Sequence, residues 1–378
     1  MIWLLYISNI KSLETEVTLT EINLYSDTQT LPTVEMRNAM YSAEVGDDLS
    51  GEDNTVINLE EKAAAMLGKE AAMYVTSGTQ GNLVAILSHC SKADEILVGS
   101  ESHIFWNENA SVSTIVGAQL RLIQNNDDGT LNLSQLQEGI RPLSSPQFPY
   151  TKLICLENTH NRCNGAAISL EHTNAVAEIA HKNDISLHVD GARIFNAAIA
   201  LGIEAQELVQ NADSITFCLS KGLSCPVGSV LCGSKDFIDE ARRWRRMLGG
   251  GMRQAGVIAA AGVVGLEQMI DRLALDHATA KNLAYKISEI PGVIIDPSSI
   301  QTNIVIFEID REVSPASDVV NALKSKGVKV STYGSIVPNG GQYIRMVTHR
   351  HIGEEDVDAA AMALSEVMAS LSLSLIHI

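Results

Sequence analysis

Short apolar runs alternate with helical segments between residues 70 and 190, and this alternation limits the fold more than any other feature of the chain. The runs are continuous rather than alternating with polar residues, which is typical of strands buried on both faces. They predict strands at 72–76, 95–98, 120–124, 152–156 and 185–189, with helices at 82–90, 105–116 and 171–182. This order predicts an α/β fold with a parallel sheet covered by helices.

The flanking segments extend this pattern. Helices are predicted at 32–40 and 56–67, on either side of an acidic loop at 46–54, and two more buried strands at 215–219 and 227–232. An arginine-rich helix follows, ends at the glycines 249–251, and gives way to a long alanine-rich helical region up to about residue 290. Pro291 and Gly292 mark a boundary, after which residues 303–370 read as a smaller α+β domain.

The charge balance excludes two kinds of general partner. The chain has 27 basic and 45 acidic residues, a formal net charge of −18, which would repel nucleic acid and anionic membranes. No run approaches the ~18 apolar residues of a membrane span. None of the six cysteines forms a C-x-x-C pair, so we expect a reducing, cytoplasmic setting without disulfides, and no metal.

Lys221 lies on the turn between the two buried strands 215–219 and 227–232. A lysine in a dry pocket can attack a carbonyl, because its amine is a nucleophile once it loses its proton. Taken alone, Lys221 is more simply interpreted as a solvated turn residue. Its function therefore depends on the residues that accompany it.

Two of these accompanying features also follow predicted strands. Gly78 and Thr79 open a helix directly after a strand, a geometry that points backbone N–H groups at an anion, although a plain turn is the alternative. Asp190 ends another strand, where a buried carboxylate needs a partner or serves as a helix cap. A lysine for a Schiff base, an aspartate for a pyridinium and an anion-binding turn together suit pyridoxal phosphate.

Longer motifs run through the chain from residue 23 onward. They are Ser26-Asp-Thr, Val45-Gly-Asp-Asp, Gly51-Glu-Asp, 76–82, 102–106, 157–162, 188–196, 217–222, 248–256 and 344–349. With these motifs the sequence resembles the low-specificity threonine aldolases, in the β-eliminating lyase group of fold-type I pyridoxal-phosphate enzymes. The chain differs from the family pattern at Tyr25, Ser50 and Cys163-Asn164, which bears on substrate preference.

The resemblance implies a fold-type I transferase-like architecture: a mostly parallel, seven-stranded sheet between helices, and a smaller C-terminal α+β domain. It implies an N-terminal extension (1–22), a segment contributing to the active site (23–50), a large cofactor domain (51–272), a small domain (273–370) and a tail of doubtful origin (371–378). The implied reaction cleaves the Cα–Cβ bond of L-threonine or L-allo-threonine to glycine and acetaldehyde. The alternatives are another β-eliminating lyase, an aminotransferase, or a nucleotide-binding or scaffold protein in which Lys221 is structural.

The resemblance also implies the residues that hold the cofactor ring. Lys221 would bind the cofactor covalently, and Asp190 would keep the ring nitrogen protonated. Arg193 would lie beside the ring hydroxyl. His103 would stack on the ring.

The phosphate and the substrate have their own implied residues. Gly78 and Thr79 would bind the phosphate, and Arg253, within the glycine-rich segment, would reach it from a neighbouring subunit of a homotetramer built from dimers.

Ser26 and Arg345 would bind the carboxylate of the amino-acid substrate, and His160 would lie near its hydroxyl. The acid–base group is left open between His103, His160 and a water that they hold.

Overall fold

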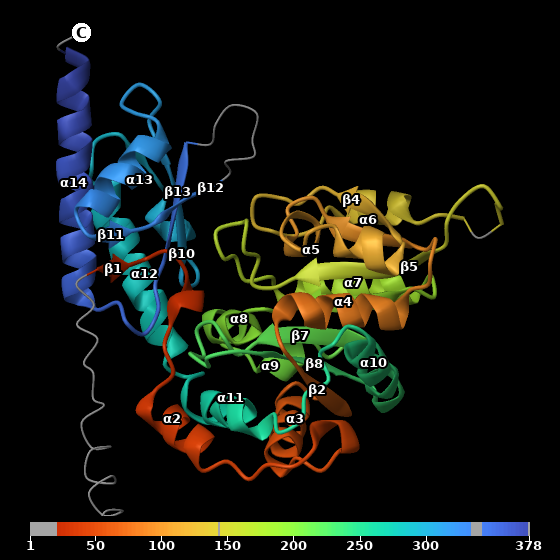
Figure 1. Cartoon of the computed structure of the whole chain (residues 1–378). Coiled ribbons are helices and arrows are strands. Elements are labelled where there is room, and N and C mark those ends of the chain that lie inside the picture. Colours follow the sequence, from red (N-terminus) through yellow and green to blue (C-terminus); the bar gives the residue numbers. More distant parts are fainter. Residues whose placement is uncertain (1–20, 143, 334–341, 377–378) are drawn as a thin grey trace, which may run out of the picture.

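The computed structural model describes residues 21–142, 144–333 and 342–376, so most of the predicted N-terminal extension and the end of the tail lie outside the described residues. Two sheets divide the molecule into a larger and a smaller part (Figure 1). In the described part of the chain, no helix is long and apolar enough to cross a bilayer.

The larger sheet has seven strands in the order β2-β8-β7-β6-β5-β3-β4. All neighbours pair in parallel except β8, which runs antiparallel to both β2 and β7. The strands are Ala71–Val75 (β2), Glu95–Gly99 (β3), Gln119–Ile123 (β4), Thr151–Glu157 (β5), Ser186–Asp190 (β6), Ser214–Cys218 (β7) and Ser229–Gly233 (β8). The predicted mostly parallel seven-stranded sheet is therefore confirmed.

Helices cover both faces of this sheet, as the continuous apolar runs required. One face packs against Gly78–His89 (α4), Val112–Val116 (η4) and Lys235–Met247 (α10). The other packs against Asn54–Met66 (α3), Leu133–Gly139 (α6), Leu170–His181 (α7), Ile194–Leu201 (α8), Ala205–Leu208 (α9) and Gly256–Gln268 (α11). Val34–Tyr41 (α2) lies against α11 at the lower edge of Figure 1.

The smaller part is built on a four-stranded antiparallel sheet, β12-β13-β10-β9. Its elements are Leu273–Ser288 (α12), Val293–Ile294 (β9), Ile304–Ile309 (β10), Ala316–Ser325 (α13), Val328–Lys329 (β11), Ser331–Tyr333 (β12), Tyr343–Val347 (β13) and Glu354–Ile376 (α14). Ile22–Asn23 (β1) pairs in parallel with β11. Leu24 is buried in this second core, whereas Met36 is buried in the first, so the N-terminal segment crosses from one part to the other.

Two local predictions were wrong. The single helix expected over 105–116 is instead a short helix, His103–Trp106 (α5), and the separate π-helical turn η4. Asn109 and Ala110 between them have positive φ, which a continuous right-handed helix does not allow. The turn expected at 77–81 is already the first turn of α4, since Ser77 caps the helix by accepting a hydrogen bond from the Gln80 amide.

Candidate active site

The carboxyl ends of the parallel strands lie together, because Glu157 on β5 is the register partner of Asp190 on β6. Ligands of open α/β sheets bind at this edge. Lys221 follows β7 in the connection to β8 and is half-buried. Its backbone carbonyl accepts a 2.9 Å hydrogen bond from the Thr30 hydroxyl, while its amine has no hydrogen bond or ion pair with any described residue.

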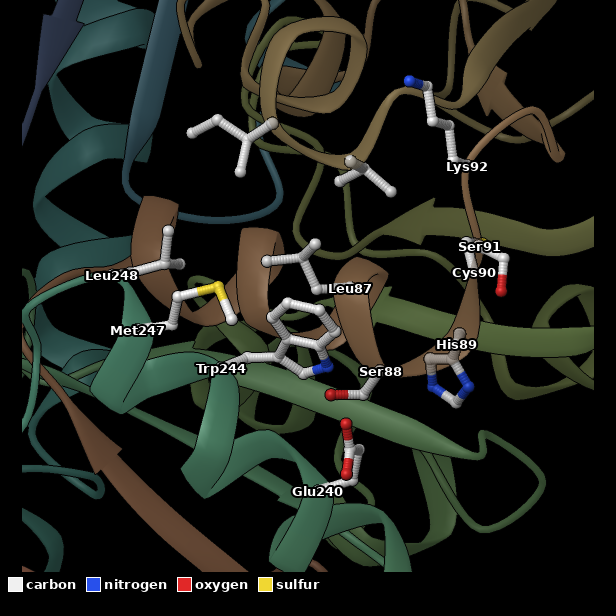
Figure 2. A pocket seen from close by; sticks show the side chains of 12 residues that line it. Leu87, Ser88, His89, Cys90, Ser91, Lys92, Glu240, Trp244, Met247 and Leu248 are labelled. Carbon is white, nitrogen blue, oxygen red and sulfur yellow. The ribbon is translucent and has the colours of Figure 1, made fainter.

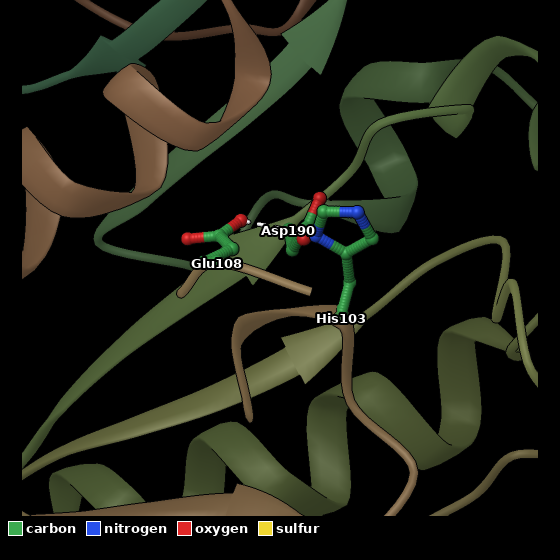
Figure 3. Close-up of side chains that lie close together, drawn as sticks. All are labelled: His103, Glu108 and Asp190. Atoms are coloured by element: carbon green, nitrogen blue, oxygen red, sulfur yellow. Dashed lines mark hydrogen bonds and ion pairs between the residues drawn. The ribbon is translucent and has the colours of Figure 1, made fainter. Parts of the chain in front are cut away.

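Asp190 belongs to a buried cluster with Glu108 and His103, shown in Figure 3. Ligand atoms of the three side chains lie within 4.8 Å of one another, and both carboxylates are at most 3 % exposed. The Asn82 amide donates one hydrogen to Asp190 and one to Glu108, each over 2.9 Å. Asp190 also accepts a hydrogen bond from the Ala192 amide. Three such groups are also potential metal ligands, and the buried Glu108 Oε2 has no hydrogen-bond partner among the described residues.

His103 is held at two points by carboxylates. Its backbone N–H donates to Glu157, and its Nδ1 lies 3.1 Å from Glu108 Oε1. Burial opposes the charged form, but the hydrogen bond to Glu108 and the charges of Asp190, Glu108 and Glu157 outweigh it and raise the pKa of His103. An ionised Glu108 can only accept, so His103 Nδ1 carries the proton of this hydrogen bond, which leaves Nε2 as the free basic nitrogen.

Asp27 and Arg193 form a buried bidentate ion pair. Arg193 Nε and Nη2 each donate to a carboxylate oxygen of Asp27 over 2.7 Å, and Arg193 Nη1 donates to Asn161 over 3.3 Å. Burial opposes ionisation of Asp27, but Arg193 and more distant Lys221 and Arg345 hold the pKa of its carboxyl far below the usual range.

Arg345 approaches the same place from β13 of the smaller part. Its Nη2 donates to Asn161 Oδ1 over 2.9 Å, and its Nη1 contacts the Tyr25 carbonyl over 3.4 Å. Burial and the positive charge of Arg193 lower the pKa of Arg345 to about 10, and its buried Nε has no partner in the described residues. Ser26 is buried beside this group, its hydroxyl accepting from Thr28.

The N-terminus of α4 lies beside the end of β7. A Cβ at Gly78 would come within 2.8 Å of Cys218 Sγ, so the close approach requires glycine. The Ser77 hydroxyl accepts from the Gln80 amide, whereas the amides of Gly78 and Thr79 have no partner in the described part of the chain. Such unpaired first-turn amides favour an anion.

Two predicted residues, His160 and Arg253, have no hydrogen bond or ion pair with the other predicted site residues that the structure describes. His160 is buried, accepts at Nε2 from the Asn125 amide over 3.3 Å, and packs against Gly129. Its Nδ1 therefore carries the proton and is without a partner among the described residues. Arg253 pairs with Asp47 over 2.6 Å, with 60 % of its side chain exposed, and its side chain has no hydrogen bond or ion pair with another predicted site residue in the described part of the chain.

These residues fit pyridoxal phosphate on three counts: unpaired amides for a phosphate, an unpaired amine for a carbonyl, and a buried carboxylate for a ring nitrogen. Sequence reasoning gave no function to Asp27, Asn82, Glu108 or Asn161. Three of these lie inside the motifs 26–28, 76–82 and 157–162, which was the available signal. Glu108 lies in no motif, and the helix predicted across it was wrong.

The chain is similar to known proteins over most of its length. The family model described as "Beta-eliminating lyase" matches residues 23–310. The chain is 41 % identical over 359 residues to the probable low-specificity L-threonine aldolase 2 of Arabidopsis thaliana, covering 94 % of this chain and 99 % of that protein. It is 40 % identical over 340 residues to the low specificity L-threonine aldolase of Escherichia coli K12, covering 90 % and 97 %. The fold is similar to that of the Leishmania major threonine aldolase (TM-score 0.78, 16 % identity, 92 % and 99 % covered).

Proposed function

The chain belongs to the β-eliminating lyase family, and we propose that it is a pyridoxal-phosphate-dependent lyase that cleaves L-threonine and L-allo-threonine to glycine and acetaldehyde. The observation that carries this proposal is the unpaired Lys221 amine at the same sheet edge as the buried Asp190 carboxylate, with Arg345 nearby in the site. The names of the relatives favour aldol cleavage over the aminotransferase alternative.

Four groups of this chain would hold the cofactor. Lys221 would bind it covalently, Asp190 would hold the ring nitrogen, and the amides of Gly78 and Thr79 would bind the phosphate. Arg193 would lie beside the ring, where its bidentate pair with Asp27 fixes the guanidinium. When bound, pyridoxal phosphate would supply a protonated ring that accepts the electrons of the bond being broken.

The substrate carboxylate would bind Arg345 and Ser26. Arg345 and Arg193 both donate to Asn161, so two guanidinium groups flank one neutral amide. Asp27 carries the one negative charge of this group, and it is already paired with Arg193. A carboxylate that pairs with Arg345 would remove this imbalance, and a bidentate pair would fix the rotation of the substrate about its Cα–N bond.

His103 would accept the proton of the β-hydroxyl. Its Nδ1 is held by Glu108, so Nε2 is the nitrogen that can take a proton. As the Cα–Cβ bond breaks, the hydroxyl proton passes to Nε2 and the aldehyde leaves. The imidazolium then returns a proton to Cα, which gives glycine. His160, with its proton at Nδ1, would act as a hydrogen-bond donor to the substrate hydroxyl and not as the base.

We extend the proposal to the assembly and its setting. Arg253 is exposed, and among the described residues its side chain pairs only with Asp47, which leaves it able to reach the phosphate of a neighbouring subunit in a homotetramer of dimers. Five of the six thiols are buried and all six are free, in keeping with a cytoplasmic protein. We retain the division into a large domain (51–272), a small domain (273–370) and an active-site segment (23–50), whose Thr30 binds the Lys221 carbonyl.

The test is spectroscopic and then catalytic. We expect the purified protein with pyridoxal phosphate to show a visible absorption band that borohydride bleaches, and Lys221→Ala to lose both the band and turnover. Lys235→Ala, an exposed lysine at the start of α10, is the matched control and keeps both. Release of acetaldehyde from L-threonine identifies aldol cleavage. Formation of a keto acid without aldehyde would instead identify a transaminase and overturn the proposal.

A further inference from the structure

A line of polar side chains runs beneath α4 from Asp190 to a pocket on the surface. Along β6, Leu187 and Val189 point into the core on one face, so His188 and Asp190 point to the opposite face, against α4. The face of a sheet that lies under a helix usually carries apolar residues. Here His188 and Ser214 are 0 % exposed and Asn82 on α4 is 1 % exposed.

The hydrogen bonds along this line are continuous. Asp190 and Asn82 are joined as described above, and Asn82 Oδ1 lies 3.1 Å from His188 Nε2. His188 Nδ1 lies 2.9 Å from the Ser214 hydroxyl, which lies 2.8 Å from His89 Nε2. His89 stacks on Phe237 at 4.5 Å.

The direction of each hydrogen bond follows from the inventory of donors. Both amide hydrogens of Asn82 go to carboxylates, so its Oδ1 must accept, and His188 Nε2–H donates. Burial lowers the pKa of His188 to about 3, so the ring is neutral and Nδ1 accepts from Ser214. The Ser214 oxygen then accepts from His89 Nε2–H. Every donor therefore points toward Asp190.

The outer end of the line is accessible. His89 is half-buried and lines a pocket of about 550 Å³ between the end of α4 and helix α10, where Trp244 and Glu240 form the facing wall (Figure 2). The next residue, Ser88, lines the same pocket but bonds to the Val84 carbonyl of its own helix. Ser88 thus shares the pocket of His89 without belonging to the line.

We propose that His89, Ser214, His188 and Asn82 form a one-way hydrogen-bond relay that positions Asp190 and stabilises its anionic form against the cofactor ring nitrogen. Aligned donors polarise one another, so each bond strengthens the next, and a satisfied buried network fixes a single arrangement. The role rests on the proposed function, because Asp190 needs this help only if a protonated ring nitrogen faces it. His89 and Ser214 are positioning residues that act through His188 and Asn82.

Ser214→Ala is the central test, since it removes one hydroxyl and breaks the relay in the middle. His188 Nδ1 then has no donor, and without that hydrogen bond its Nε2–H is less polarised and donates more weakly to Asn82. We expect the dissociation constant for pyridoxal phosphate to rise about threefold to tenfold, the effect of about one hydrogen bond. We also expect the visible band to change with pH at a higher midpoint than in the wild type. A ring nitrogen that is less protonated would leave the Lys221 nitrogen attached to the cofactor more basic.

His89 gives a second, surface-accessible test. His89→Leu removes the terminal donor and should produce a smaller change in the same direction, whereas His89→Gln keeps an N–H and should restore the wild-type values. Ser88→Ala is the matched control and should change neither value. These His89 variants decide the matter if Ser214→Ala does not fold.

The measurements separate this proposal from a purely structural role. Thermal unfolding of each variant is followed with and without cofactor, and loss of a structural contact alone lowers both midpoints equally. The relay instead reduces the difference between them. Unchanged cofactor affinity and band midpoint in Ser214→Ala or His89→Leu would overturn the relay. A wild-type protein that shows no band with pyridoxal phosphate would overturn the proposed function itself.

Discussion

Replacing Glu108 by glutamine tests whether His103 is the proton acceptor. The change keeps the shape of the side chain and removes its charge. Glu108 Oε1 lies 3.1 Å from His103 Nδ1, and two unit charges at this distance interact by about 1.3 kcal/mol even at the dielectric constant of water. That energy equals about one pKa unit. Since only 30 % of the His103 side chain is exposed, the effective dielectric is lower, and we expect a shift of about one to two units.

The sign follows from the form of His103 that the reaction needs. Only the neutral imidazole can accept the hydroxyl proton, so activity falls as the pH drops through the His103 pKa. If His103 is the base, we expect this acidic limb in the wild type to lie above the ordinary value of 6.5, because Glu108, Asp190 and Glu157 together raise the pKa of His103 against the effect of burial. Glu108→Gln removes the contribution of Glu108, so the limb moves to lower pH.

The assay is the pH profile of kcat with saturating L-threonine, with acetaldehyde release as the signal. Glu101→Gln is the matched control, because Glu101 lies two residues from His103 but pairs with Arg162 over 2.7 Å. Its profile should match the wild type, and Glu108→Asp, which keeps the charge, should stay closer to the wild type than Glu108→Gln. An acidic limb that stays in place or moves up in Glu108→Gln would refute the assignment of His103 as the base.

Three further predictions concern other parts of the site. Arg345→Lys should raise KM for threonine and lower kcat/KM by at least about tenfold, because an ammonium cannot form a bidentate pair with a carboxylate; steady-state kinetics with unchanged values would remove Arg345 from the site. Asp27→Asn should lower the free energy of unfolding by about 3–5 kcal/mol, because it leaves the Arg193 charge buried without its partner, and denaturant unfolding measures this. Mixing inactive Lys221→Ala with inactive Arg253→Ala under subunit exchange should restore activity if sites are shared between subunits; no recovery despite demonstrated exchange would refute sharing.

Local hydrophobic patterns in the sequence were sufficient to predict most strands and helices of the fold. The continuous apolar runs at 185–189 and 215–219 predicted buried strands, and the strands of the larger sheet formed within a residue or two of their predicted positions. The helix expected over 105–116 did not form as one element, and one of the contacts at the break is distant in sequence. The helix ends at Trp106, Glu108 is buried and bonded to Asn82 and His103, and a π-helical turn begins at Val112.

The site was harder to predict because its partnerships span long distances in sequence. Asp190, Lys221 and the start of α4 could be grouped because each follows a strand, and strand ends meet at one edge. The pair between Asp27 and Arg193 joins residues 166 positions apart, and no spacing or periodicity predicts it. The sequence motifs contained both residues but could not show that they contact each other.

The distribution of charge in the site gives a physical reason for the orientation of the substrate. Asp190 and Glu108 make one side anionic, and Arg193 and Arg345 make the other cationic, with Asp27 neutralising only one of the two guanidinium groups. An arginine drawn partly out of water without a carboxylate partner is costly, and the lowered pKa of the half-buried Arg345 reflects that cost. An amino acid that places its carboxylate at Arg345 removes this cost, whereas the reverse orientation would leave Arg345 unpaired and bring the carboxylate toward Asp190 and Glu108. The same charges that hold the cofactor ring would therefore also determine which end of the substrate faces it.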